Sequence, residues 1–528
     1  MGTRQFRESG KRKGVRRPGR LAVGAVCTVL GVAAFGLAAA APAAHAASTK
    51  LGPTVTRTGT GPTGYTVTFR YYNPTATRVQ IKGEWYFSSP QDTTNTTSQG
   101  LLPAQWQPGD FPIAYPNATA ANWPVSDMTK NPATGIWSFT TPLPSGNFNY
   151  GFFVDCASST GSGCPELADP ANPPWNDLNG VSSGSVEPTS QVYLPSDRAF
   201  GTVDYSWQAP RAERGRLVDV SYPDPQSTSP AGTHPLAIYT PPGYSSHRKT
   251  PYPTLYLSHG GGGNEVDWST QGVAANIIDN LIRTGQVQPM VVVMTNFNGL
   301  PGGTAGYSTD VIDYVIPYVQ AHYNVSASPT DRAIAGLSAG GARANDLLVN
   351  HTGEFGYYSI MSPGGGFPAT LTSAQLAAIR SVLSLQIGGG LQDPIRANLT
   401  TEESELSAGA VPLTDDSING GHEWYVWRIL LRDFLTKMVF KATTTTVTVT
   451  GTKAVATVRA DTTEPATPRG TVRFYAEGAA FGRPVTVAHG SAAISLRALT
   501  AGSHVITAVY SGDDSYAASA SAPVIVSG

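Results

Sequence analysis

The segment from Val218 to about Phe440 constrains the fold of this chain most strongly, because short apolar runs alternate there with helical patterns. Residues 254–257, 290–294 and 333–335 have the length and aliphatic character of buried strands. One helix is indicated by apolar residues three and four positions apart that form a single stripe: Val311, Tyr314, Val315, Tyr318 and Val319. Alternating strands and helices predict a three-layer α/β domain over residues 212–440, with this helix on a face of the sheet.

The two flanking segments have different patterns. From Leu51 to about Val192, alternating runs are separated by turn residues and show no helical period, which predicts an N-terminal β-sandwich over residues 51–195. After Lys441 the chain changes to strands rich in threonine, valine and alanine, which predicts a small β-sandwich over residues 442–528. We therefore expect a multidomain protein.

The first residues predict export. A basic stretch from Lys11 to Arg20 runs into an uncharged apolar segment that ends in Ala44-His45-Ala46, as in a signal peptide over residues 1–46. No later run of about 20 apolar residues indicates a membrane anchor. The mature protein is expected to be secreted and extracellular. Arg16-Arg17 leaves twin-arginine export open beside the general route.

Cysteine usage and charge agree with this compartment. Of three cysteines, Cys27 lies in the signal segment, and the remaining pair, Cys156 and Cys164, flanks a short Ser/Gly-rich spacer that suits a disulfide. A net charge of −1 with 13% charged residues argues against a nucleic-acid partner. The sequence contains no HExxH, paired-histidine or CxxC pattern, so we expect neither a catalytic metal nor a cofactor. It does not indicate an oligomeric state.

The strongest catalytic motif is Gly336-Leu337-Ser338-Ala339-Gly340, which lies between a predicted strand and a helical run at 342–349. This context is typical of a nucleophile elbow, a sharp turn that lifts a serine hydroxyl above the sheet. Side chains at positions 336 and 340 would crowd the turn, and Gly341 is expected to let the helix approach the strand. The motif predicts an α/β-hydrolase with Ser338 as nucleophile.

Chain order selects the general base, because α/β-hydrolases place the acid and then the histidine after the serine. Three other histidines follow Ser338: His351 ends the helix after the elbow, and His489 and His504 belong to the C-terminal β domain. The base is therefore predicted to be His422, in a glycine-rich turn before a helix.

The acid has several candidates between Ser338 and His422. We favour Asp393, because it follows the apolar strand 382–387 and three glycines and so should lie at a strand's carboxyl edge. The alternatives Asp415 and Asp416, close to His422 in a polar loop, are expected to face solvent.

Acyl transfer also requires N–H donors for an oxyanion. The run from His259 to Gly263 follows a strand where the oxyanion loop belongs. We expect one donor to be the backbone N–H of Ala339 and the other to come from Gly260, Gly261 or Gly262. A phosphate-binding loop is the alternative for such a run, but Asn264-Glu265 stands where Lys-Ser/Thr would follow.

Together these motifs resemble the esterase D group of α/β-hydrolases, which contains feruloyl and acetyl-xylan esterases, enterobactin esterases and mycolyltransferases. The resemblance spans about residues 218–440 and rests on four stretches: 239–244, 257–268, 331–341 and 420–427. It implies the triad Ser338, Asp393 and His422 and an oxyanion loop at Gly260 to Gly262.

The flanking domains carry resemblances of their own. Residues 69–74, 128–130, 136–137 and 142–151 are similar to the early-set immunoglobulin-like modules that precede some feruloyl and enterobactin esterases. Residues 470–475 and 501–513 resemble bacterial immunoglobulin-like repeats. In the N-terminal module, Trp85, Trp123 and Trp137 fit either the core or a sugar-binding face, and the core is favoured. The stretch 88–116 is either a loop that reaches the active site or a surface loop.

We expect a serine carboxylic ester hydrolase whose substrate is an aryl or acyl ester, with feruloyl or acyl esters of plant polysaccharide favoured by secretion and the appended β domains. The substrate choice rests on family analogy. The alternatives are a siderophore (enterobactin-like) esterase, a mycolyltransferase-like acyltransferase and an inactive hydrolase-fold scaffold that presents binding domains.

Overall fold

The computed structural model describes residues 50–91, 100–113, 125–175, 189–460, 467–513 and 516–527. The predicted signal peptide, Cys27 and Trp123 lie outside these residues. Within them, none of the helices is both long and apolar enough to cross a membrane.

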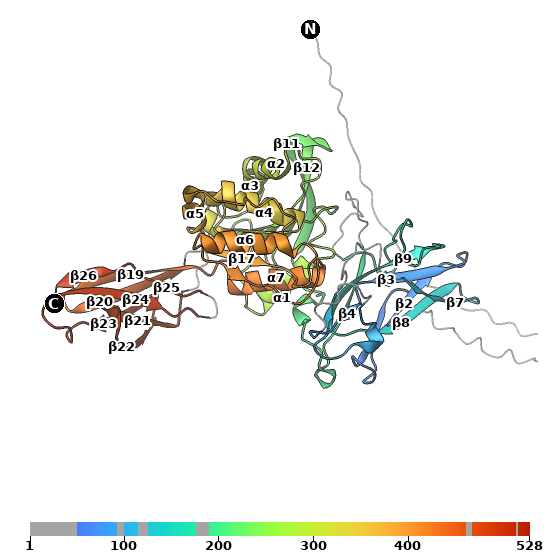
Figure 1. The fold of residues 1–528 in the computed structure, drawn as a ribbon, viewed down its shortest axis with the longest axis horizontal. Coiled ribbons are helices and arrows are strands. Elements are labelled where there is room, and N and C mark those ends of the chain that lie inside the picture. Colours follow the sequence, from blue (N-terminus) through green and yellow to red (C-terminus); the bar gives the residue numbers. More distant parts are fainter. Residues whose placement is uncertain are drawn as a thin grey trace, which may run out of the picture. The chain divides into compact units, whose positions relative to one another are not determined.

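The N-terminal part is built from two four-stranded antiparallel sheets (Figure 1). The first has the order β1 (Thr54–Arg57), β2 (Tyr65–Tyr72), β8 (Ile136–Pro142), β7 (Thr129–Asn131). The second has the order β10 (Ser190–Leu194), β9 (Gly146–Val154), β3 (Val79–Gly83), β6 (Ser126–Asp127). Trp85 and Trp137 are only 3% and 5% exposed in the apolar core, so the core interpretation of these two residues is confirmed.

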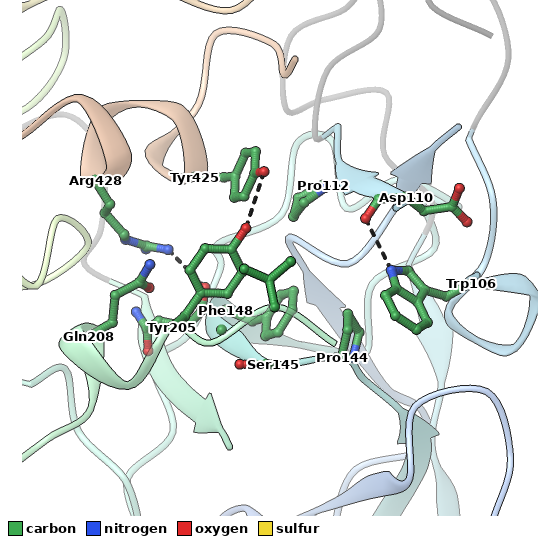
Figure 2. Close-up of a pocket in the computed structure, with 13 residues that line it drawn as sticks. Trp106, Asp110, Pro112, Pro144, Ser145, Phe148, Tyr205, Gln208, Tyr425 and Arg428 are labelled. Atoms are coloured by element: carbon green, nitrogen blue, oxygen red, sulfur yellow. Dashed lines mark hydrogen bonds between the residues drawn. The ribbon is translucent and has the colours of Figure 1, made fainter. Parts of the chain in front are cut away.

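In the described part of the 88–116 stretch, a few buried residues anchor a chain that is otherwise largely exposed. It contains a 3₁₀ turn, Pro103–Gln105, and β5 (Phe111–Pro112), which pairs with β4 (Phe87–Ser88). Trp106 is 4% exposed and donates its indole N–H to Asp110 O at 3.3 Å (Figure 2). Further along, Cys156 and Cys164 form the predicted disulfide.

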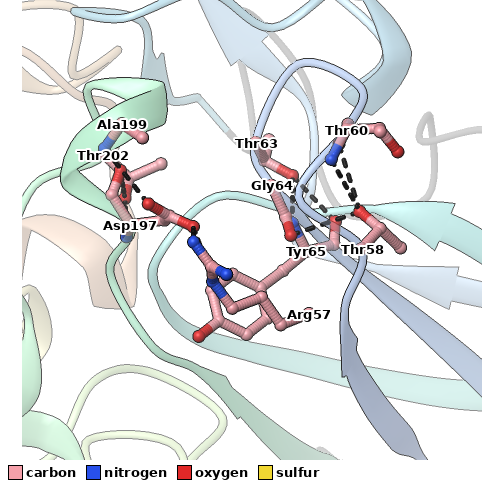
Figure 3. A network of polar contacts seen from close by, with 9 residues as sticks. All are labelled: Arg57, Thr58, Thr60, Thr63, Gly64, Tyr65, Asp197, Ala199 and Thr202. Atoms are coloured by element: carbon pink, nitrogen blue, oxygen red, sulfur yellow. Dashed lines mark hydrogen bonds and ion pairs between the residues drawn. The ribbon is translucent and has the colours of Figure 1, made fainter.

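The segment after β10 is fastened back onto the sandwich (Figure 3). The buried Asp197 carboxylate accepts from Arg57 Nε at 2.9 Å and from Ala199 N at 3.1 Å, capping the 3₁₀ turn Arg198–Phe200. A Cβ at Gly64 would lie 2.5 Å from the Phe200 ring, so glycine lets this turn lie against the β1–β2 hairpin. These contacts set the direction in which the chain leaves the sandwich.

The central domain is an eight-stranded sheet in which the first strands pair antiparallel and the rest parallel. Its order is β11 (Arg216–Thr228), β12 (Ala231–Thr240), β14 (Val291–Thr295), β13 (Thr254–Ser258), β15 (Arg332–Leu337), β16 (Tyr357–Met361), β17 (Ser384–Gly388), β18 (Thr414–Asp415). Successive side chains alternate between two apolar cores; Leu255 and Leu257 face one, and Tyr256 faces the other.

Helices cover both cores (Figure 1). One core contains residues of α1 (Ala274–Arg283) and α7 (Trp424–Lys437). The other contains residues of α2 (Gly303–Asp310), α3 (Ile316–His322), α4 (Ala339–Asn350), α5 (Ser373–Ile379) and α6 (Arg396–Ala408). A π turn, Val311–Val315, joins α2 to α3, and the predicted apolar stripe packs against this second core. The three-layer α/β prediction is confirmed.

The C-terminal part is a small β-sandwich with its own apolar core. One sheet has the order β19 (Thr443–Thr450), β20 (Lys453–Ala460), β23 (Ser491–Ser495). The other has the order β22 (Ala479–Thr486), β21 (Thr471–Ala476), β24 (Ser503–Tyr510), β25 (Ser519–Ala520), with β26 (Val524–Ser527) also paired to β24. The multidomain fold class expected from the sequence is therefore confirmed.

A buried arginine connects the N-terminal sandwich to the α/β domain. Arg428, on α7, is 1% exposed; its Nη1 donates to Asn147 O of β9 at 2.8 Å and its Nε to Gln271 O at 2.9 Å. The Glu84 carboxylate lies 4.0 Å from the guanidinium. Burial lowers the pKa of Arg428 to about 10 and raises that of Glu84. The buried charges of Arg428 and Glu84 compensate each other, and the hydrogen bonds to the two carbonyl oxygens compensate the guanidinium further.

Replacing this arginine should destabilise the protein strongly. In Arg428→Met two carbonyls lose their donor and Glu84 loses its cation, so we expect a loss of about 3–5 kcal/mol, measured by denaturant unfolding of the full chain. Arg432→Met is the matched control on the same helix: Arg432 is 39% exposed and pairs with Asp433, so its loss should be below about 1 kcal/mol. Equal effects of the two substitutions would contradict the role given to the buried arginine.

Candidate active site

Four loops meet at one edge of the sheet because the strands before them are parallel and in register. Ser258 pairs with Gly336, Leu337 with Met361, and Met361 with Gly388. The glycine run, Ser338, the turn after β16 and the loop carrying Asp393 therefore all begin at the carboxyl ends of neighbouring strands, where α/β proteins bind ligands.

Ser338 occupies the sharp turn predicted for it. It lies between β15 and α4 with φ 53° and ψ −118°, outside the conformations that a non-glycine residue ordinarily adopts. A Cβ at Gly336 would stand 2.2 Å from Gly340 O, and one at Gly340 would stand 2.4 Å from His259 O. The expected steric reason for both glycines is thus present. A Cβ at Gly341 would lie 3.0 Å from Pro363 Cα, so the close approach there is to the chain after β16.

Asp393 and His422 are brought together. His422 Nδ1 and Asp393 Oδ2 are 2.9 Å apart, and the Asp393 side chain is 2% exposed while that of His422 is 24% exposed. The loops that carry them are tied by Gln392 N donating to Gly420 O at 3.0 Å and Gly420 N donating to Gln392 Oε1 at 2.8 Å. An aspartate in this position holds an imidazole with its Nδ1 protonated and its Nε2 free to accept a proton.

Ser338 Oγ has no hydrogen bond to another residue in the described part of the chain. Hydrogen bonds of catalytic groups are often long without substrate and shorten only in the complex.

The competing acids are placed differently. Asp415 is exposed, as expected. Asp416 is not: its side chain is 15% exposed, accepts from Gln386 Nε2 at 2.8 Å and lies 3.7 Å from Lys437 Nζ. The expectation that Asp416 faces solvent is wrong, because this carboxylate is held by Gln386 of β17 and Lys437 of α7.

The glycine run lies against the elbow. A Cβ at Gly260 would stand 3.6 Å from Ser338 Cβ, and one at Gly261 would stand 3.9 Å from Ala339 Cβ. Gly262 has φ 81°, which a side chain would strain. Ala339 is the first residue of α4, so its N–H has no partner within the helix and points out of its N-terminus. This geometry suits an oxyanion site made by Ala339 and one of the two nearer glycines.

Buried neighbours hold the glycine run in shape. His259 Nδ1 donates to Gly260 O at 2.7 Å, and His259 Nε2 accepts from Phe297 N at 3.3 Å. Burial lowers the pKa of His259 to about 3, so the ring is neutral, as these two bonds require. The His259 ring stacks on the Phe297 ring, with centroids 3.8 Å apart. The Arg343 guanidinium lies over the Phe297 ring, 3.5 Å from its centroid. The support extends to Asn298 Nδ2, which donates to Gly263 O at 2.7 Å.

The turn after β16 contains a site residue that the sequence reasoning missed. Gly364 N donates to Ser338 O at 2.8 Å, and a Cβ at Gly364 would stand 3.3 Å from Ala339 N. A side chain there would crowd the N–H predicted to bind the oxyanion. The run Pro363-Gly364-Gly365-Gly366 at the end of a strand was the available signal.

Trp427 was also missed as part of the base's surroundings. Its ring meets the His422 ring edge-on, with centroids 4.9 Å apart, and its indole N–H donates to Ser362 Oγ at 3.2 Å. Among the described residues, no cluster of three or more His, Cys, Asp or Glu side chains could hold a metal ion.

Comparisons with known proteins assign two of the domains to families. Residues 227–438 match the family described as putative esterase, and residues 440–527 match the bacterial Ig-like domain, group 3. These matches confirm the resemblances drawn from the sequence for the α/β and C-terminal domains.

Curated relatives cover the same region. The chain is 32% identical over 203 residues to an endo-1,4-beta-xylanase/feruloyl esterase of Xylanibacter ruminicola, which is 36% of this chain and 27% of that protein. It is 30% identical over 186 residues to endo-1,4-beta-xylanase Y of Acetivibrio thermocellus, or 33% of this chain and 17% of that protein. The chain thus matches about a quarter or less of the length of these two relatives.

One solved structure extends over more of the chain. The enterobactin esterase FES from Shigella flexneri aligns with 73% of this chain and 96% of its own, at 17% identity and a TM-score of 0.47.

The elbow geometry leads to a mutational test. In Gly340→Ala the new methyl group would meet two backbone carbonyls, of Ser258 and His259, so the turn must shift. We expect a loss of about 1–3 kcal/mol in stability and a large fall in kcat for any ester that the protein cleaves. Gly353→Ala, where a Cβ meets nothing within 4 Å, is the control and should leave both unchanged. Unchanged activity in Gly340→Ala would show that the turn tolerates the displacement.

Proposed function

Because residues 227–438 match the esterase family, we propose that this protein is a secreted serine carboxylic ester hydrolase that acts on feruloyl or acyl esters of plant cell-wall polysaccharide. The observation that carries the catalytic part is the Asp393–His422 hydrogen bond of 2.9 Å at the same sheet edge as the strained Ser338 turn. An activated serine requires a base, and a group that orients it, in this arrangement.

The proposed reaction is acyl transfer in two steps. Ser338 Oγ attacks the ester carbonyl while His422 Nε2 accepts its proton, and the resulting oxyanion is bound by the N–H of Ala339 and a glycine N–H of the 260–262 run. The alcohol leaves with the proton from His422. Water then attacks the acyl-serine, with His422 again as base, and the acid departs. Throughout, Asp393 holds the imidazole and stabilises its charged form.

The polysaccharide part of the proposal is supported by the relatives and the domain arrangement. Both relatives described above carry the word xylanase in their names, and one is also named a feruloyl esterase. The C-terminal Ig-like domain and the N-terminal sandwich add surface that a small soluble ester does not need. Export by a signal peptide over residues 1–46 completes the proposal.

The first test is release of ferulate. The protein should release ferulate from methyl ferulate and from feruloylated arabinoxylan, followed by chromatography, and Ser338→Ala should reduce the rate by about 10⁵-fold or more. A short-chain nitrophenyl ester serves as a general esterase control. Cleavage of this control alone would retain the triad and reject the ferulate assignment; no cleavage of any ester would favour the inactive scaffold.

The choice of acid is tested by a pair of isosteric substitutions. Asp393→Asn presents an amide to His422 Nδ1, which favours the wrong tautomer, and should lower kcat by about 10⁴-fold with little change in KM. Asp415→Asn removes a nearby but exposed carboxylate and should leave kcat within about twofold of the parent. The reverse pattern would transfer the role to Asp415.

A further inference from the structure

Arg343 contacts both halves of the predicted oxyanion site. It lies in the second turn of α4, and its Nη1 donates to Ala339 O at 2.9 Å. On another side, its guanidinium lies 3.5 Å from the centroid of the Phe297 ring. That ring stacks on His259, whose Nδ1 donates to Gly260 O at 2.7 Å. One side chain therefore joins the helix that carries one predicted donor to the residues that hold the glycine run.

The Phe297 ring is held between two groups. The His259 ring is 3.8 Å and the Arg343 guanidinium 3.5 Å from its centroid, and two groups this close must occupy opposite faces. Phe297 N also donates to His259 Nε2 at 3.3 Å. A guanidinium is attracted to the negative face of an aromatic ring. Arg343 therefore stabilises the position of Phe297 against the buried His259.

Pairing with an acid does not explain this arginine. Within the described part of the chain, Arg343 makes no ion pair with a carboxylate, and its Nε is buried without an acceptor. Burial lowers the pKa of Arg343, because the charged form is poorly hydrated there. The two contacts that the guanidinium does make, with the Phe297 ring and with Ala339 O, both lead to the oxyanion site.

The glycine run forms a turn whose shape selects one N–H. Gly260 O accepts from Gly263 N at 3.3 Å and from His259 Nδ1. Gly262 has φ 81° and Gly261 does not have a positive φ, which matches a type II turn with these two residues at its centre. A trans peptide places its C=O and N–H on opposite sides. The Gly261 N–H therefore points away from the two donors that hold Gly260 O.

The Gly261 N–H is also better placed than that of Gly260. A Cβ at Gly261 would stand 3.9 Å from Ala339 Cβ, and Gly261 is exposed whereas Gly260 is buried. His259 O lies 2.4 Å from a Cβ built at Gly340, so the Gly260 N–H of the same peptide points away from Gly340. Of the two glycines near the elbow, Gly261 offers the second donor.

We propose that Arg343 is a positioning residue for ester cleavage, which fixes the Gly261 N–H relative to the Ala339 N–H through its contacts with Phe297 and Ala339 O. Oxyanion donors act when they lie about 2.7–3.1 Å from the oxygen that becomes charged. A displaced donor weakens binding of the transition state more than binding of the substrate. The proposal rests on the proposed function, because the oxyanion forms only if Ser338 attacks an ester.

The positioning role is tested with Arg343→Met, which keeps a long side chain over Phe297 and removes the charge. We expect kcat for 4-nitrophenyl acetate to fall about 10- to 100-fold, with KM within about twofold of the parent and an unchanged or higher melting temperature. In Arg343→Ala, millimolar guanidinium ion should restore part of the lost kcat, whereas it should not raise kcat of the parent. Arg380→Met removes an exposed arginine at the end of α5 that donates to Gly409 O, and should leave kcat unchanged.

The donor assignment is tested by two substitutions at Gly261. Proline has no N–H and is favoured at the first central position of a type II turn, so Gly261→Pro should keep the turn and lose the donor. Gly261→Ala is the matched reference, since it adds the same Cβ and keeps the N–H. With 4-nitrophenyl acetate, kcat of the proline variant should be about 10²- to 10³-fold below that of the alanine variant, at similar KM.

Two results would overturn the role given to Arg343 in a protein that cleaves the ester. One is a parental kcat in Arg343→Met. The other is a lower kcat that accompanies a lower melting temperature and is not restored by guanidinium, because this pattern reports packing alone. Equal kcat values of the two Gly261 variants would remove the donor assignment. Failure of the proposed function is distinct, because the parent protein itself would then leave 4-nitrophenyl acetate intact, and Arg343 would have no oxyanion site to position.

Discussion

The parallel pairing of β13, β15, β16 and β17 is the constraint on which the site depends. Its register brings the residues after Ser258, Leu337, Met361 and Gly388 to one edge, although they are up to 130 positions apart in the chain. Parallel strands cannot be joined by tight turns, so each pair requires a crossover that returns over a face of the sheet. The helices that bury the two cores are therefore also the reason that four functional loops share an edge.

The N-terminal sandwich is joined to this arrangement by a charged group rather than by apolar packing alone. Arg428 takes its acceptors from both sides, Asn147 O in the sandwich and Gln271 O in the α/β domain. From Gln271 the contacts continue to Trp424 and Trp427, and the Trp427 ring meets His422. A buried cation is stable only where its partners are in place. The α/β domain, which carries the predicted base, therefore takes from the sandwich an acceptor for its buried arginine.

Local sequence patterns were sufficient for the elbow and for the fold class. The requirement for glycine at positions 336 and 340 is steric and local, so GxSxG between a strand and a helix identified the turn that the structure contains. Asp393 was preferred to the other acids because it follows a predicted strand. The structure pairs it with His422, and its role in catalysis stays a prediction. The same reasoning misjudged Asp416, because its partners Gln386 and Lys437 are distant in sequence. Gly364 was missed for a related reason. It matters because it lies close to the Ala339 N–H, and the pairing of β15 with β16 brings these two residues together.

The unpaired polar side chains between the domains were also beyond sequence reasoning, and their energetics explain why. Trp85 and Trp137, the residues that a sugar-binding reading of the sandwich would select, are in its core, whereas Ser145, Asn147 and Gln208 carry no distinctive motif. What distinguishes them is a mismatch between burial and hydrogen bonding, which exists only once two domains and a connecting segment surround them. Replacing such groups by apolar ones would favour the folded state. Asn149 Oδ1, on the same strand as Asn147, is also unpaired among the described residues. The polar stabilisation of this junction therefore comes from its bonded groups, above all Arg428, because the unpaired groups oppose folding.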